Sequence, residues 1–89
     1  MRSNLGDKTF KILKQNLTTD DIILVSEEEI VDAMRLVMER MKIVIEPSSA
    51  TVVAAVLKDK RFRDKNVCCI ITGGNLDMSS FFDSIKAKL

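Results

Sequence analysis

Two short apolar runs, at residues 22–25 and 67–72, constrain the fold of this chain more than any other feature of its sequence. A run with almost no polar position is typical of a β-strand that is covered on both faces. Helical patterns separate the two runs, so the strands should lie parallel in one sheet. Because two strands make a poor sheet, we expect an α/β segment of a larger parallel-sheet domain, incomplete on its own.

Four helices are predicted around these strands from capping residues and apolar spacing. Asp7 can cap the first helix, and the capping box Ser26-Glu-Glu-Glu29 starts the second. Pro47 suits the opening turn of a third helix, which we place at residues 48–60. The fourth helix runs from residue 77 or 78 to residue 88. The expected order of elements is therefore α-β-α-α-β-α.

The apolar faces of these helices indicate how each should pack. In the first helix the apolar positions recur at helical spacing: Phe10, Leu13 and Leu17. The second helix has a longer apolar face: Ile30, Ala33, Met34, Val37, Met38 and Met41. We expect its three methionines to be core residues. The third helix is apolar at every position from 52 to 57, so it should be enclosed by other protein.

No disulfide or metal staple is expected, although 89 residues form one domain at most, with a thin stability margin. Cys68 and Cys69 are neighbours in the second predicted strand, where consecutive side chains point to opposite faces. That geometry rules out a disulfide framework. The chain has no histidine, so a zinc site of the usual kind cannot form either. Buried, reduced thiols suit a cytoplasmic location.

Charge and hydropathy argue against nucleic acid and against a membrane as partners. The chain carries 14 Lys and Arg and 13 Asp and Glu, a formal charge of +1, and its basic residues are scattered. Nucleic acid is therefore not an expected partner. The apolar runs are much shorter than the roughly 18 residues of a membrane span, and residues 1–10 are too polar for a signal peptide.

Two short motifs could carry chemistry. Thr72-Gly-Gly-Asn75 follows the second predicted strand, at the sheet edge where α/β domains bind ligands. Paired glycines let the backbone approach a flat ligand, although the same motif is also an ordinary turn. Glu46 precedes the proline that opens the third helix, where it is either a helix cap or a site residue. The residues alone leave both alternatives open.

The arrangements of a self-sufficient enzyme are missing from the sequence. It has no histidine to serve as a general base, no glycine-rich phosphate loop and no Gly-x-Ser-x-Gly elbow. Without further information, the residues indicate a small α/β fragment with a ligand-binding edge.

Several segments, taken in order and spacing, resemble one family. They are Arg2-Ser-Asn-Leu-Gly6, residues 21–30, Ile45-Glu-Pro-Ser-Ser-Ala50, residues 52–57 and residues 71–77. Together they resemble the carboxyl-terminal part of serine racemases and catabolic serine or threonine dehydratases, which are pyridoxal-phosphate enzymes of fold type II. The resemblance runs nearly from end to end of the chain.

This resemblance implies a fold, a cofactor and partners. Residues 1–89 would be the carboxyl-terminal part of a large cofactor-binding domain with the tryptophan synthase β-like fold, without a separate second domain. The complete enzyme would be a lyase or isomerase that uses pyridoxal 5'-phosphate and acts on a hydroxy amino acid, serine or threonine. The rest of the enzyme chain is the implied partner, and a homodimer is suggested.

The resemblance also assigns roles to individual residues. Thr72 matches the Ser or Thr whose hydroxyl hydrogen-bonds the pyridine nitrogen of the cofactor. Gly73 and Gly74 match the turn that holds that hydroxyl in place, and Glu46 matches an acid near the cofactor ring. Ser49 stands where dehydratases commonly have glycine.

The departures from the family pattern limit what this chain should do alone. The family's cofactor-binding lysine, its phosphate-binding glycine loop and its acidic metal site match nothing in the sequence. We therefore expect no catalytic residue and no metal site here, and an inactive chain in isolation. The alternatives are a non-catalytic module that docks on a full-length relative, and a gene-model fragment with no independent role.

Overall fold

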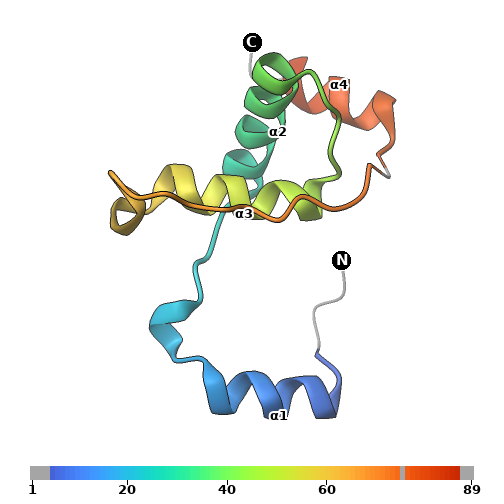
Figure 1. The fold of residues 1–89 in the computed structure, drawn as a ribbon. Coiled ribbons are helices and arrows are strands. Elements are labelled where there is room, and N and C mark those ends of the chain that lie inside the picture. Colours follow the sequence, from blue (N-terminus) through green and yellow to red (C-terminus); the bar gives the residue numbers. More distant parts are fainter. Residues whose placement is uncertain (1–4, 75, 87–89) are drawn as a thin grey trace.

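The computed structural model describes residues 5–74 and 76–86. Within these residues the chain forms four α-helices and two short 3₁₀ helices (Figure 1). The α-helices are α1 (Asp7–Asn16), α2 (Glu27–Met41), α3 (Pro47–Lys58) and α4 (Met78–Lys86). The 3₁₀ helices are η1 (Thr19–Asp21) and η2 (Lys60–Phe62). All four predicted α-helices are therefore present. The predicted end of the fourth, at residue 88, lies outside the described residues.

The start of α2 confirms the predicted capping box. The Ser26 hydroxyl accepts a hydrogen bond from the Glu29 amide at 3.1 Å, and the Glu29 carboxylate accepts one from the Ser26 amide at 2.8 Å. Both amides would otherwise lack a partner at the helix start. The helix ends at Met41, because Lys42 takes the left-handed conformation with φ of 61°. Local chemistry thus sets both ends of this helix.

The two predicted strands are not formed among the described residues. Segments 22–25 and 67–72 are extended, but neither is part of a sheet. A strand is defined by backbone hydrogen bonds to a neighbouring strand. Within the described part of the chain, the one backbone hydrogen bond to the end of the second segment joins the Glu46 amide to the Gly73 carbonyl. The predicted α-β-α-α-β-α order is therefore not confirmed within the described residues.

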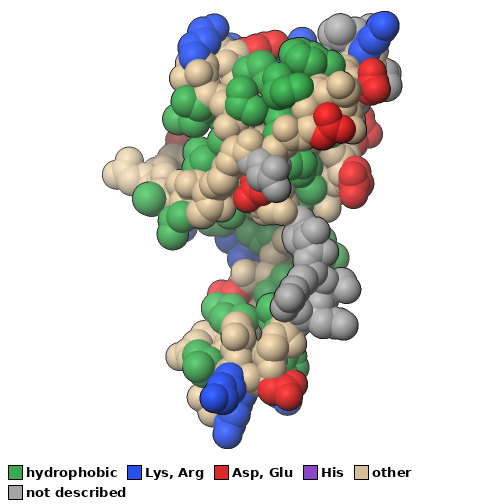
Figure 2. Space-filling view, turned by 90° about the vertical axis from the view of Figure 1, so that its right-hand side faces the viewer, with side chains coloured by type: hydrophobic (Ala, Val, Ile, Leu, Met, Phe, Trp, Pro, Cys, Tyr) green, Lys and Arg blue, Asp and Glu red, His purple; other side chains and the backbone are tan. Residues whose placement is uncertain are grey.

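Each extended segment nevertheless has a covered face and a bare face. Val25 and Ile71 pack against the core, whereas Leu24 is 81% exposed and Ile70 is 75% exposed. Such alternation is what a strand shows when one side of its sheet is missing. Figure 2 shows hydrophobic side chains gathered on the upper body of the molecule, which carries α2 to α4. The expectation of an incomplete domain agrees with this exposure.

The core lies where α2 and α3 cross and α4 covers them (Figure 1). Its buried apolar residues are Ala33, Met34, Val37, Ile45, Ala50, Ala54 and Phe81. The alanines on α2 and α3 let the two helices approach closely. The predicted methionine face is confirmed at Met34, which is buried, and at Met38, which is partly buried; it is wrong at Met41, which is 56% exposed.

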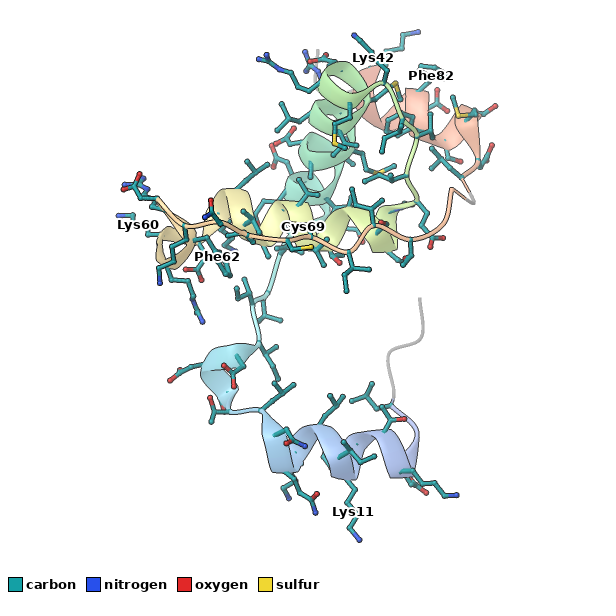
Figure 3. All side chains as sticks on the ribbon, in the orientation of Figure 1. Lys11, Lys42, Lys60, Phe62, Cys69 and Phe82 are labelled. Carbon is teal, nitrogen blue, oxygen red and sulfur yellow. The ribbon has the colours of Figure 1, made fainter. Side chains whose placement is uncertain are left out.

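Other apolar residues have no covering neighbour within the described part of the chain. Phe10 of α1 and Leu17, directly after this helix, are exposed, and Figure 1 shows α1 apart from the other three α-helices. The third helix was expected to be enclosed by other protein, and within this chain Leu57 is left 60% exposed. Both cysteines were expected to be buried, but Cys68 is exposed and Cys69, which lies along α3 in Figure 3, is half-buried.

Two basic side chains hold the segment before α2 against the end of α3. The Lys58 ammonium donates to the Leu24 carbonyl at 2.8 Å and pairs with the Glu29 carboxylate at 3.3 Å. The Arg61 guanidinium donates to the Asp20 carbonyl at 2.6 Å. These contacts give the extended segment 22–25 a fixed course without a sheet.

Replacing Ser26 with alanine tests the capping box. The Ser26→Ala variant should lose about 1 kcal/mol of stability, because the Glu29 amide loses its acceptor. Denaturant unfolding followed by circular dichroism measures the loss. Ser48→Ala, at an exposed serine of α3, is the matched control, and equal stability of the two variants would contradict the capping role.

Stability should also fall with acid through Glu29. Its pKa is lowered below 4.5, first by the hydrogen bond from the Ser26 amide and then by those from the Ser26 side chain and Lys58. A lowered pKa in the folded state means that this stabilisation is present above pH 4.5 and disappears as the pH falls through the folded value. Glu29→Gln keeps an acceptor but does not titrate, so its unfolding free energy should vary less with pH below 4.5. An identical pH profile for the two proteins would refute this.

Candidate functional site

The turn at residues 72–74 lies against the first turn of α3. The Thr72 amide donates to the Ser49 hydroxyl at 2.9 Å, and the Glu46 amide donates to the Gly73 carbonyl at 3.3 Å. The structure therefore brings together Glu46, Thr72 and Gly73, three of the residues singled out from the sequence. The two segments are more than twenty residues apart in the chain, and these two bonds set their relative position.

Both glycines of this turn are explained by close approach of other atoms. Gly73 has a φ of +59°, in the left-handed region that favours glycine. A Cβ at this position would lie 2.5 Å from a carboxylate oxygen of Glu46, which is closer than real contacts allow. A Cβ on Gly74 would lie 3.3 Å from the Val44 carbonyl oxygen. The glycine pair thus does more than turn the chain: Gly73 makes room for the Glu46 carboxylate, and Gly74 lets the backbone pass close to the Val44 carbonyl.

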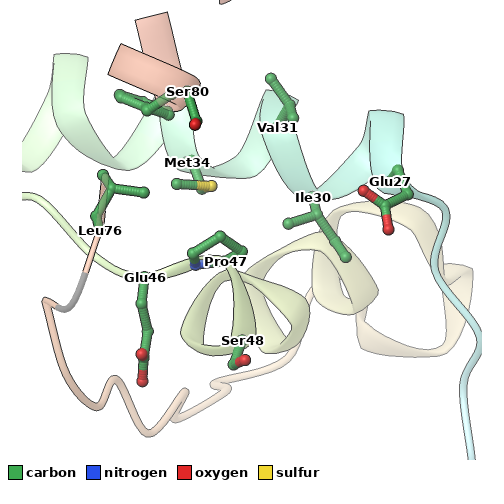
Figure 4. A pocket seen from close by; sticks show the side chains of 10 residues that line it. Glu27, Ile30, Val31, Met34, Glu46, Pro47, Ser48, Leu76 and Ser80 are labelled. Atoms are coloured by element: carbon green, nitrogen blue, oxygen red, sulfur yellow. The ribbon is translucent and has the colours of Figure 1, made fainter. Parts of the chain in front are cut away.

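The Glu46 side chain makes no capping hydrogen bond in the described structure. The residue is at the N-cap of α3 with extended backbone, φ of −73° and ψ of 157°. Figure 4 shows its carboxylate pointing away from Pro47, and its oxygens lie against Gly73. The sequence left open whether Glu46 is a helix cap or a site residue. The hydrogen bond that a side-chain cap would make to the first turn of α3 is not formed. The negative charge still lies near the helix N-terminus, where it is favourable.

Thr72 is exposed at the end of the extended segment, directly after the half-buried Ile71. Its amide is held by Ser49. Within the described part of the chain, no hydrogen bond is seen from its hydroxyl. A hydroxyl can both donate and accept, so this one is available to a ligand that approaches the turn from outside.

A hollow of about 460 Å³ lies between α2, α3 and α4, on the other side of Pro47 (Figure 4). Its walls are mostly apolar and include Ile30, Met34 and Phe81, with Glu46 at its margin. Thr72, Gly73 and Gly74 do not line it. We therefore place the candidate site at the turn and not in this hollow.

Sequence reasoning missed the role of Ser49. Its side chain is 4% exposed, in the first turn of α3, and supplies the acceptor for the Thr72 amide. A polar residue on the buried side of a helix start is a usable sign of such a bond, because a buried hydroxyl needs a partner. Its partner, 23 residues further along, could not be identified from that sign.

The described residues offer neither a metal-binding cluster nor a membrane-spanning helix. Among the described residues, no three His, Cys, Asp or Glu side chains are grouped so that they could hold a metal ion. None of the helices in that part of the chain has the length and apolar character needed to cross a bilayer.

Known proteins resemble this chain strongly. Residues 1–73 match the family described as "Pyridoxal-phosphate dependent enzyme". A serine racemase of Dictyostelium discoideum is 55% identical over 82 residues, 88% of this chain and 24% of that protein. An L-threo-3-hydroxyaspartate ammonia-lyase of a Pseudomonas species is 40% identical over 84 residues, covering 93% and 26% of the two chains. Human serine racemase is 40% identical over 91 residues, covering 97% and 26%.

The chain spans about a quarter of the length of these relatives. No solved structure was found that matches it. The family match covers 73 of the 89 residues and ends within the turn that carries Thr72 and Gly73. It confirms the resemblance noted in the sequence and implies pyridoxal phosphate as the cofactor of the complete enzyme. On these grounds, the chain belongs to the family of pyridoxal-phosphate-dependent enzymes.

Proposed function

We propose that residues 1–89 are the carboxyl-terminal part of the large cofactor-binding domain of an enzyme that racemises or deaminates a hydroxy amino acid, serine or threonine. The observation that carries this proposal is the exposed Thr72 hydroxyl. The backbone amide of the same residue is hydrogen-bonded to Ser49 in the first turn of α3. The names of the relatives, serine racemase and hydroxyaspartate ammonia-lyase, support the substrate class and the two reaction types.

Thr72 would hold the pyridine nitrogen of the cofactor by a hydrogen bond. The cofactor, when bound, supplies an electron sink that weakens the bonds to the substrate's α-carbon. A neutral hydroxyl stabilises a positive charge on the ring nitrogen less than a carboxylate would, so it favours a milder sink. Loss of a β-hydroxyl or exchange of a proton at the α-carbon needs no stronger one.

Glu46, Gly73 and Gly74 would complete this side of the cofactor site. The Glu46 carboxylate lies where a side chain at Gly73 would otherwise be, so the glycine lets an acid lie directly against the turn that carries Thr72. The carboxylate would then lie near the ring, where it can accept a hydrogen bond.

The rest of the enzyme is the first partner that this proposal requires. The residues that bind the cofactor covalently and grip its phosphate match nothing in the chain, so the chain would contribute one wall of the site and no catalytic residue. A homodimer and a cytoplasmic location complete the proposal. The free thiols of Cys68 and Cys69 suit that location.

A second candidate function is a non-catalytic module that docks on a full-length relative. The bare faces of segments 22–25 and 67–72, where Leu24 is 81% and Ile70 is 75% exposed, favour it. Large exposed apolar surfaces commonly mark sites where another protein binds. Both functions require that other protein covers these faces.

The purified chain should be inactive alone. When it is incubated with pyridoxal phosphate and L-serine or L-threonine, no pyruvate or 2-oxobutyrate should form, because nothing grips the cofactor's phosphate or holds it covalently. Product assays by coupled dehydrogenase absorbance measure this. Turnover above that of free pyridoxal phosphate would refute the prediction.

Thr72 can be tested in a complete enzyme, made by joining this chain to the upstream three-quarters of the Dictyostelium serine racemase. Thr72→Val removes the hydroxyl but keeps the branched shape, and should weaken cofactor binding about five- to tenfold. Thr72→Ser keeps the hydroxyl and is the matched control. Fluorescence titration of the apoenzyme with pyridoxal phosphate gives both affinities, and equal affinity of the valine and serine variants would contradict the proposed role.

A further inference from the structure

Ser49 is the one buried polar side chain among the described residues, at 4% exposure. It lies in the first turn of α3 beside Ala50, which is fully buried. Burying a hydroxyl without a hydrogen bond is costly, so a serine at such a position needs a partner. Its partner is the Thr72 amide at 2.9 Å.

Thr51, two residues further along α3, shows that a hydroxyl in this helix can bond to the helix's own backbone. The Thr51 hydroxyl donates to the Ser48 carbonyl of its own helix at 2.7 Å. Serine and threonine in helices commonly bond back in this way. Ser49 instead accepts from a residue 23 positions away. The Ser49 hydroxyl therefore links α3 to the turn at residues 72–74.

Two bonds from α3 hold the backbone on both sides of the Thr72–Gly73 peptide. The Ser49 hydroxyl accepts a hydrogen bond from the Thr72 amide, and the Glu46 amide donates one to the Gly73 carbonyl at 3.3 Å. Thr72 otherwise belongs to an extended segment that has no sheet around it in the described structure. The direction of its side chain therefore depends on these two bonds.

We propose that Ser49 is a positioning residue for the cofactor site: its buried hydroxyl holds the Thr72 amide so that the Thr72 hydroxyl faces outward, toward the cofactor's ring nitrogen. This inference rests on the proposed function of Thr72 and adds the group that orients it. An alanine at this position would leave the Thr72 amide to bond with water, and the Thr72 hydroxyl would lose its fixed direction.

The test is a double-mutant cycle in the joined enzyme described above, with pyridoxal phosphate as the titrant. Ser49→Ala should weaken cofactor binding about fivefold and shift the absorption maximum of the bound cofactor. Added to Thr72→Val, it should weaken binding no further, because the two residues act through one contact. Ser48→Ala, at the exposed neighbour in the same turn, is the matched control and should bind normally.

A second measurement and a second variant keep the inference falsifiable. Hydrogen exchange at the Thr72 amide should speed up about fivefold in Ser49→Ala and stay unchanged in Ser48→Ala. If Ser49→Ala fails to fold, Ser49→Cys keeps the size of the side chain with a weaker acceptor, and should show the same changes.

Two results would overturn the inference while leaving the proposed function intact. One is an effect of Ser49→Ala on cofactor binding that is equally large in the Thr72→Val background. The other is normal cofactor binding, or normal exchange at the Thr72 amide, in Ser49→Ala when Thr72→Val alone weakens binding. If Thr72→Val alone changes nothing, the proposed function fails, and the inference fails with it.

Discussion

The contact between the turn at residues 72–74 and the first turn of α3 is the interaction on which the candidate site depends. It consists of two hydrogen bonds, from the Thr72 amide to Ser49 and from the Glu46 amide to the Gly73 carbonyl. It also needs the absence of a side chain at Gly73, where the Glu46 carboxylate lies. These three conditions place an exposed hydroxyl and a carboxylate around one short stretch of backbone.

The rest of the described structure packs against one side of the contact between the turn and α3, through the core formed by α2, α3 and α4. Helices α2 and α3 bury a small core rich in alanine, and α4 adds Phe81 to it. The segments that should be strands expose alternate side chains, with Leu24 and Ile70 outward and Val25 and Ile71 inward. In a chain that spans a quarter of its relatives' length, this pattern fits a domain wall whose opposite side belongs to other protein.

The parts of the fold that sequence predicted are those decided by neighbours in the chain. The capping box at residues 26–29 and the helix opened by Pro47 depend on contacts a few residues long, and both are present. Strand pairing depends on distant segments, so an apolar run such as 67–72 predicts extended backbone but cannot supply a partner. Helical spacing likewise placed Met34 and Met41 on one face. It could not predict where along that face the covering residues end, and Met41 lies beyond that point. At the site, residue types indicated Thr72 and Glu46, whereas the link through Ser49 needed three-dimensional proximity.

The most direct test of the account is an experimental structure of the joined enzyme with pyridoxal phosphate bound. The account predicts that the Thr72 hydroxyl oxygen lies at hydrogen-bond distance from the pyridine nitrogen, about 2.6–3.2 Å. It also predicts that the Ser49 hydroxyl still accepts from the Thr72 amide. A cofactor ring whose nitrogen is held by another residue, with the Thr72 side chain turned away, would contradict it.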